Sequence, residues 1–109
     1  MQLKLSICSF VLIATASVNP AWTFAYYTDP DFRGGGFIHN GNGDGCFGVE
    51  PALADDISSF IWKSDPACDL ILYALPSCEQ TLMTVAAPQA QFPNMLNMDD
   101  QTASFRVTC

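Results

Sequence analysis

The chain has 109 residues, half of them apolar, and 4 basic against 11 acidic residues give it a net charge of −7. A chain of this length forms one small domain. A negative surface repels nucleic-acid phosphates and anionic lipid. Nucleic-acid binding and cationic membrane lysis are therefore excluded as leading functions, whereas cations and basic partners are favoured.

The first 16 residues predict a secretory signal. A charged start containing Lys4 is followed by the apolar stretch Leu5–Ala16, which ends on small residues. The stretch is too short to cross a bilayer. Cleavage as late as residues 21–25 would cut into an aromatic run, so we place it after Ala16. We expect a secreted, extracellular domain over residues 17–109 with no membrane span and, once Lys4 is lost, a charge of −8.

Short strands are the secondary structure that the mature part predicts. Aromatic and β-branched residues are concentrated in four runs. These runs are Trp22–Tyr27, Phe60–Trp62, Leu70–Tyr73 and Phe105–Val107. Glycines and prolines interrupt the rest so often that no window supports a long helix, and residues 51–55 have room for one turn at most. The pattern predicts an all-β sandwich of about eight strands built from Greek keys.

The glycine-rich segment 40–45 predicts a turn. It resembles the start of an EF-hand loop, but Pro51 stands where a bidentate glutamate is needed, so we do not assign a metal to it. His39, the one histidine, is expected to be a solvated turn residue beside it. A single histidine and the lack of any marked substrate cleft give no support to a hydrolase triad or a carboxylate pair, and we expect no enzyme activity.

Four cysteines remain after the signal, and an even number in a short exported chain predicts two disulfides. They are Cys46, Cys68, Cys78 and Cys109. A zinc site is the rival interpretation. It is disfavoured because no Cys-x-x-Cys spacing occurs and only one histidine is present.

The chain contains an internal repeat. The segment Asp55–Phe60 reads Asp-Asp-Ile-Ser-Ser-Phe, and Asp99–Phe105 reads Asp-Asp-Gln-Thr-Ala-Ser-Phe. Tyr27 recurs as Tyr73 in nearly the same register. Self-similarity at a fixed spacing indicates repeated supersecondary units. We therefore divide the domain into two units, at about residues 22–63 and 68–109.

The start of each unit resembles the hairpin signature of βγ-crystallins, which is an aromatic residue, four further residues, a second aromatic, any residue and glycine. Residues 27–34 match it with Tyr27, Phe32 and Gly34. The second copy keeps Tyr73 but has Cys78 and Gln80 in place of the second aromatic and the glycine. The resemblance implies a βγ-crystallin-like sandwich, and within it the disulfides Cys68–Cys109 and Cys46–Cys78.

The repeated acidic segments resemble the calcium motif of that family, two Asn or Asp residues, two variable ones, Ser or Thr, then Ser. The resemblance implies that paired motifs exchange ligands. A better site would use the Asp100 side chain, the Gln101 carbonyl and the Ser58 hydroxyl. A weaker one would use Asp55 and the Asp56 carbonyl, because Ala103 replaces the expected hydroxyl. Calcium prefers such oxygen ligands, although Asp and Ser also cap turns without any metal.

Three functions stay open. The first is a secreted calcium-binding module that acts by extracellular binding, as a toxin, effector or antimicrobial protein, because small exported microbial killer toxins resemble this chain. The second is a secreted proteinase inhibitor of the same fold. The third is a structural extracellular protein with metal-free motifs. We expect a monomer whose partner is an extracellular protein or carbohydrate.

Overall fold

The computed structural model describes residues 21–95 and 100–109, so the predicted signal segment lies outside the described residues. Regular structure within this part consists of eight strands and two three-residue 3-10 turns. The strands are β1 Ala21–Asp29, β2 Arg33–Asn42, β3 Gly45–Gly48, β4 Ser59–Asp65, β5 Asp69–Leu75, β6 Glu79–Val85, β7 Gln89–Phe92 and β8 Ser104–Thr108. The turns are η2 Pro30–Phe32 and η3 Pro51–Leu53. The prediction of an all-β chain with about eight strands is confirmed.

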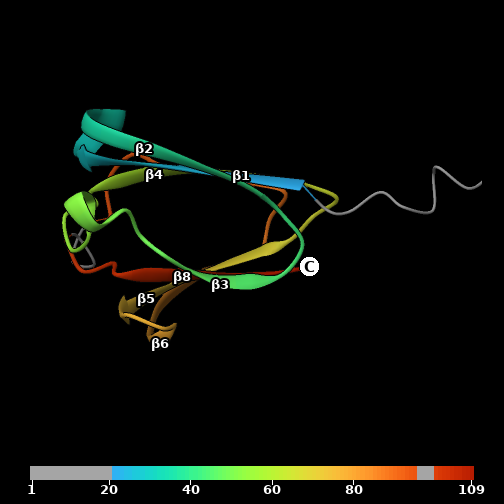
Figure 1. Cartoon of the computed structure of the whole chain (residues 1–109). Helices are drawn as coiled ribbons and strands as arrows, with labels where there is room; N and C mark the ends of the chain where they lie inside the picture. The colour runs from blue at the N-terminus through green and yellow to red at the C-terminus, as the bar shows by residue number, and fades with distance from the viewer. Residues whose placement is uncertain (1–20, 96–99) are drawn as a thin grey trace, which may run out of the picture.

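The strands form two antiparallel sheets that face each other as two layers (Figure 1). The first sheet has the order β2-β1-β4-β7 and the second has the order β3-β8-β5-β6. Within each unit the first and last strands are antiparallel neighbours, β1 with β4 and β5 with β8. The third strand of each unit crosses to the other sheet, where β3 pairs with β8 and β7 pairs with β4. The sandwich of two Greek keys is thus confirmed, with one strand exchanged in each direction.

Alternation along β1 produces the centre of the core. Trp22, Phe24 and Tyr26 point inward and are 4%, 0% and 0% exposed. They meet aromatic side chains from both sheets, and the rings of Phe24 and Phe105 lie 4.8 Å apart at a steep angle. Burying one such side chain contributes about 2–3 kcal/mol. The aromatic run that predicts the first strand therefore also joins the two layers.

The hairpin that opens each unit has the same backbone in both copies. Three residues in each hairpin have a positive φ, at 61°, 61° and 80° in the first and at 65°, 59° and 61° in the second. They are Asp31, Phe32 and Gly34 in the first copy and Ser77, Cys78 and Gln80 in the second. Tyr27 and Phe32 form the expected aromatic corner, with ring centroids 5.9 Å apart. The second copy keeps this conformation without the aromatic pair and without the glycine.

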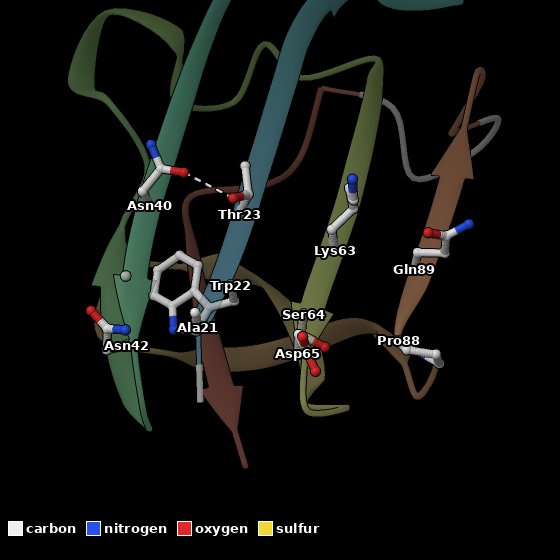
Figure 2. A pocket seen from close by; sticks show the side chains of 11 residues that line it. Ala21, Trp22, Thr23, Asn40, Asn42, Lys63, Ser64, Asp65, Pro88 and Gln89 are labelled. Atoms are coloured by element: carbon white, nitrogen blue, oxygen red, sulfur yellow. Dashed lines mark hydrogen bonds between the residues drawn. The ribbon is translucent and has the colours of Figure 1, made fainter. Parts of the chain in front are cut away.

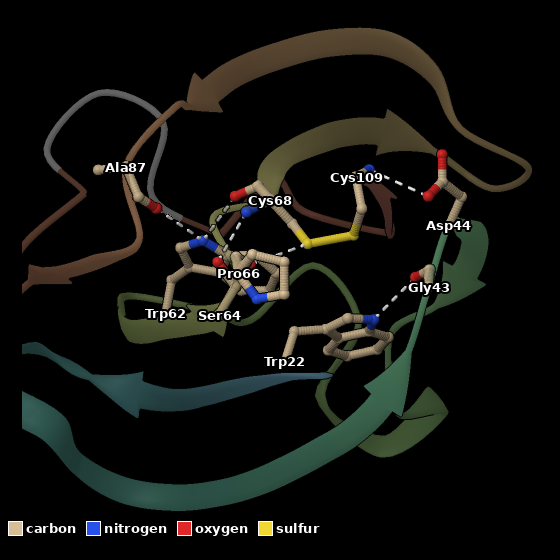
Figure 3. Close-up of a disulfide and its surroundings, with 9 residues drawn as sticks. All are labelled: Trp22, Gly43, Asp44, Trp62, Ser64, Pro66, Cys68, Ala87 and Cys109. Carbon is tan, nitrogen blue, oxygen red and sulfur yellow. Dashed lines mark hydrogen bonds between the residues drawn. A yellow bond between two sulfur atoms is a disulfide. The ribbon is translucent and has the colours of Figure 1, made fainter. Parts of the chain in front are cut away.

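Two disulfides connect the cysteines as the family resemblance implies, Cys46 with Cys78 and Cys68 with Cys109. Figure 3 shows the second bridge between the start of β5 and the end of β8. Nearby, the Asp44 carboxylate accepts a hydrogen bond from the Cys109 N–H at 3.0 Å. Both bridges involve the second sheet or its hairpin, and neither involves a strand of the first sheet.

Two local predictions are wrong. Residues 40–42 continue β2, and the turn is confined to Gly43 and Asp44, because β1 pairs with β2 as far as Ala21 opposite Asn42. Gly41 is needed there since a Cβ would collide with the Trp22 ring. His39 consequently lies in a strand and is not a solvated turn residue.

Across residues 21–95 and 100–109, no helix has the length and apolar character to cross a membrane.

Candidate functional site

The two acidic segments lie side by side and bond to each other reciprocally. The Asp55 N–H donates to the Thr102 carbonyl at 2.9 Å, and the Asp100 N–H donates to the Ile57 carbonyl at 3.0 Å. Both aspartates have a left-handed backbone, with φ of 62° and 58°. Because Asp tolerates this conformation better than most residues, the repeated aspartates help to set the path of each loop.

The structure brings together Ser58 and Asp100, two residues of the better predicted site. The Ser58 hydroxyl donates to an Asp100 carboxylate oxygen at 3.4 Å. Ser58 is 4% exposed, and its N–H and carbonyl are bonded to Tyr27 and Met95. Asp100 is exposed, and Gln101 follows it directly. A fixed buried hydroxyl, an exposed carboxylate and a neighbouring carbonyl are hard oxygen donors, and their chemistry fits calcium.

The second predicted site has one oxygen fewer. Asp55 and Asp56 are exposed on the first loop. Ala103 occupies the position equivalent to Ser58, since its N–H donates to Tyr73 as the Ser58 N–H donates to Tyr27. It has no hydroxyl to offer. Asp99 lies outside the described residues, and the described part holds no group of three or more His, Cys, Asp or Glu side chains placed to bind a metal. Hydroxyl and carbonyl oxygens would therefore have to complete any calcium shell.

The last serine of each motif has a structural role that sequence reasoning missed. Ser59 is fully buried, donates to the Asp29 carbonyl at 2.7 Å and accepts from the Phe32 N–H at 3.0 Å. Ser104 makes the equivalent bonds to the Leu75 carbonyl and the Cys78 N–H, at 2.6 and 2.9 Å. Each serine thus fastens the acidic loop to the hairpin of its own unit. The repeated Ser-Phe pair was the signal that could have revealed it.

A polar cluster of a fully buried tyrosine and a partly buried histidine lies between the sheets, next to Glu50. The Tyr26 hydroxyl lies 2.9 Å from His39 Nε2 and accepts a hydrogen bond from the Glu50 N–H at 2.7 Å. Burial raises the pKa of Tyr26 above its usual value. Burial also lowers the pKa of His39, and the Glu50 carboxylate partly opposes this shift. The cluster favours a neutral histidine.

An open groove of about 650 Å³, lined by both polar and apolar residues, crosses the first sheet. One row of paired residues supplies much of its lining, because Asn40, Thr23, Lys63 and Gln89 are successive partners on β2, β1, β4 and β7 (Figure 2). The Thr23 hydroxyl donates to the Asn40 side-chain carbonyl at 2.8 Å, which turns the amide N–H groups away from it. Asp65 also lines the groove, so the negative charge of Asp65 balances the positive charge of Lys63. The arrangement suits a neutral ligand that has both hydrogen-bonding groups and apolar surface, because Trp22, Ala21 and Pro88 also line the groove.

Solved structures resemble this chain in fold. The N-terminal domain of protein S is 20% identical, with a TM-score of 0.57, and the match covers 78% of this chain and 93% of that one. A βγ-crystallin domain from Clostridium beijerinckii is 16% identical, with a TM-score of 0.59 and coverage of 79% and 97%. One from Flavobacterium johnsoniae is 19% identical, with a TM-score of 0.57 and coverage of 79% and 93%. No family model matches the chain, and no curated protein matches it.

These structures define the class of fold. With exchanged third strands, two folded hairpins and paired acidic loops, the chain has the βγ-crystallin fold. At identities of 16–20% the likeness concerns the arrangement of the backbone. Ligands and partners must be argued from the side chains of this chain.

Proposed function

We propose that this chain is an exported binding module of the βγ-crystallin fold, strengthened by one calcium ion and acting on an extracellular target as a toxin or effector does. The signal-like first 16 residues and the two disulfides support export, since disulfides persist in oxidising compartments. The observation that carries the calcium part is the contact between Ser58 and Asp100 across the two loops.

Ser58, Asp100 and the Gln101 carbonyl would hold the ion. Calcium would supply a positive charge between two loops that carry acidic side chains, in a chain of charge −7. Binding to the folded state alone would raise the free energy of unfolding by about 2.7 kcal/mol at a hundredfold excess over the dissociation constant. The loops come from different units, so the ion would stabilise the junction between them.

The groove on the first sheet is the surface where we place the target. A carbohydrate is the class that we favour, because its hydroxyl groups both donate and accept. The groove offers amides from Asn40 and Gln89, a hydroxyl from Thr23 and a balanced pair of charges. A neutral glycan also avoids repulsion from a negatively charged domain.

The calcium proposal is tested by thermal unfolding with calcium and with a chelator. The wild-type chain should melt several degrees higher in millimolar calcium. Asp100→Ala should lose this increase. The matched control is Asp69→Ala, which removes the same charge from an exposed position on β5 and should keep it. A wild-type melting temperature that calcium leaves unchanged contradicts the proposal.

The groove is tested on an array of neutral glycans with two matched variants. Thr23→Ala removes a hydroxyl that orients the groove, and we expect binding to weaken about tenfold, which corresponds to one lost hydrogen bond. Thr84→Ala makes the same change on an exposed position of β6 in the other sheet and should bind as the wild type does. Equal loss in both variants, or no binding by the wild type, rules the groove out as a glycan site.

A further inference from the structure

Strand β2 is a long edge that no other described strand covers. It has ten residues, the largest number of any described strand, and it pairs on one side only, with β1. A strand at a sheet edge presents a row of N–H and C=O groups on which another strand can build. Folded proteins normally prevent such pairing with recognisable devices.

The other three edges of the sandwich have such devices. β3 and β7 are only four residues long. β3 is also tied by the Cys46–Cys78 bridge, and β7 lies between Pro88 and Pro93. β6 begins at the acidic Glu79, and the register of its pairing with β5 shifts next to Tyr73. Short length, proline, charge and irregular pairing each discourage strand addition.

β2 has less of this protection, because it is ten residues long and the register of its pairing with β1 shifts only at the hairpin end, between Tyr27 and Asp29. Its sequence from Arg33 to Asn42 contains no proline, no lysine and no acidic residue, although the chain has 11 acidic residues. Arg33, at its first position, is its one permanently charged side chain. Near its middle, Phe37 is 37% exposed and Ile38 is 57% exposed. Protein interfaces also have few charged residues at their centre, so β2 resembles the core of an interface.

We propose that β2 pairs antiparallel with β2 of a second copy of this chain, which joins the two first sheets into one continuous sheet. The local chemistry selects this partner. A basic strand would be drawn to acidic side chains, and β2 has none. A second copy brings the same charge-poor, apolar edge, and a twofold axis is the usual symmetry of such pairs. This departs from the monomer that the sequence led us to expect.

The pleat restricts the register of the pair. Residues opposite each other across an antiparallel pair lie on the same face of the sheet. A twofold axis perpendicular to the sheet can therefore pass midway between the two Ile38 residues, which places their side chains together on the outer face. Phe37 then lies opposite His39 of the second copy. The centre of the contact is apolar.

Charge makes the dimer weak and dependent on salt. Two copies of net charge −7 repel each other, and dissolved salt screens this repulsion. Added salt should strengthen the association. The proposal goes beyond the proposed function, but it adds to it, because Asn40 of β2 lines the groove and pairing would place two grooves on one sheet face. Two linked sites bind a repetitive target far more tightly than one.

Sedimentation equilibrium of the oxidised chain, in chelator so that calcium has no part, tests the proposal. From about 10 µM to about 1 mM the mass of the mature wild-type chain, residues 17–109, should rise from that of one copy toward twice that value, and more steeply in high salt. Ile38→Lys places a charge at the centre of the pair and should raise the dissociation constant about tenfold or more. Leu75→Lys alters another exposed apolar side chain, 40% exposed at the end of β5, and should leave the constant unchanged.

Hydrogen exchange of backbone amides shows which surface is used. In the wild type, amides of β2 that point away from β1 should become protected as concentration rises, and those of β6 should not. In Ile38→Lys the added protection should be absent while the amides shared with β1 stay protected, which shows that the variant is folded. A wild type that remains monomeric at about 1 mM overturns the proposal. So does a dimer whose β2 amides gain no protection.

Discussion

Thr102 shows how far the two units have diverged at a single buried position. Its side-chain oxygen is fully buried and has no hydrogen-bond partner among residues 21–95 and 100–109. The equivalent residue of the first unit is Ile57, which is fully buried and has no polar atom in its side chain. An unpaired buried hydroxyl lowers stability by about 1–3 kcal/mol. The second acidic loop is therefore held less well than the first.

Thr102→Val removes this hydroxyl and keeps the shape of the side chain. We expect the free energy of unfolding to rise by about 1 kcal/mol in urea denaturation. Ser104→Ala provides the opposite case two residues away, because the Ser104 hydroxyl is bonded on both sides. Its loss should lower stability by about 1–3 kcal/mol. If both variants moved stability in the same direction, hydrogen bonding would not be what distinguishes these positions.

His39 makes stability depend on pH. Its pKa is lowered by burial, so the unfolded chain binds a proton at a higher pH than the folded chain does. The free energy of unfolding has its full value above the pKa of His39 in the unfolded chain, about 6.5. It decreases as the pH falls from there through the lower pKa of His39 in the folded chain. His39→Gln should flatten the free energy of unfolding between about pH 7 and pH 5. Denaturation at several pH values measures this, and equal slopes in both proteins would contradict it.

At the level of elements, strand β1 could be predicted from sequence and β2 could not. The aromatic alternation from Trp22 to Tyr27 is a local signal, and the run lies within β1. The glycines at 34–36 mask a strand that exists because β1 supplies its hydrogen-bond partners. The groove was harder still to predict from the sequence. Its residues come from four separate segments, and only the pairing register of the strands aligns Asn40, Thr23, Lys63 and Gln89.

The contact between Ser58 and Asp100 was easier to predict than the second hairpin. The family resemblance paired these two residues, and the fold places them together because the two loops bond to each other. The hairpin at Cys78 and Gln80 lost its sequence signature but kept its shape. Ser104 and the Cys46–Cys78 bridge hold it there, and both constraints come from residues distant in the sequence.

The backbone conformation imposed on Gln80 lowers the stability of the fold. Gln80 has a φ of 61° where the first hairpin has Gly34 at 80°. A side chain in this region costs about 1–2 kcal/mol of stability. Replacing it with glycine removes that cost, but glycine also makes the unfolded chain more flexible, which offsets part of the gain. Gln80→Gly should raise stability by about 0.5–1 kcal/mol, as measured in urea. Gly34→Ala should lower it, because the new Cβ would meet the side chains of Thr28 and Asp29. A loss of stability in Gln80→Gly would mean that its side chain makes a compensating contact.

The whole molecule depends on its two bridges because a small domain buries little surface. The bridged cysteines are 32 and 41 residues apart, and the entropy of loop closure varies slowly with length. Replacing either pair with alanine should therefore cost about 4 kcal/mol, and the two costs should differ by only about 0.2 kcal/mol. Urea denaturation of each double variant measures both. A pair whose removal cost nothing would show that its loop is already restricted in the unfolded chain.

The exchange of β3 and β7 between the sheets has a consequence for how the chain assembles. Neither unit contains the neighbour that its own third strand requires, so each is incomplete until the other is present. Two separated halves, residues 21–65 and 69–109, would have to collide before either could finish its sheet, and their folding would slow with dilution. One continuous chain makes that encounter intramolecular. The short link of residues 66–68 thus converts a second-order reaction into a first-order one.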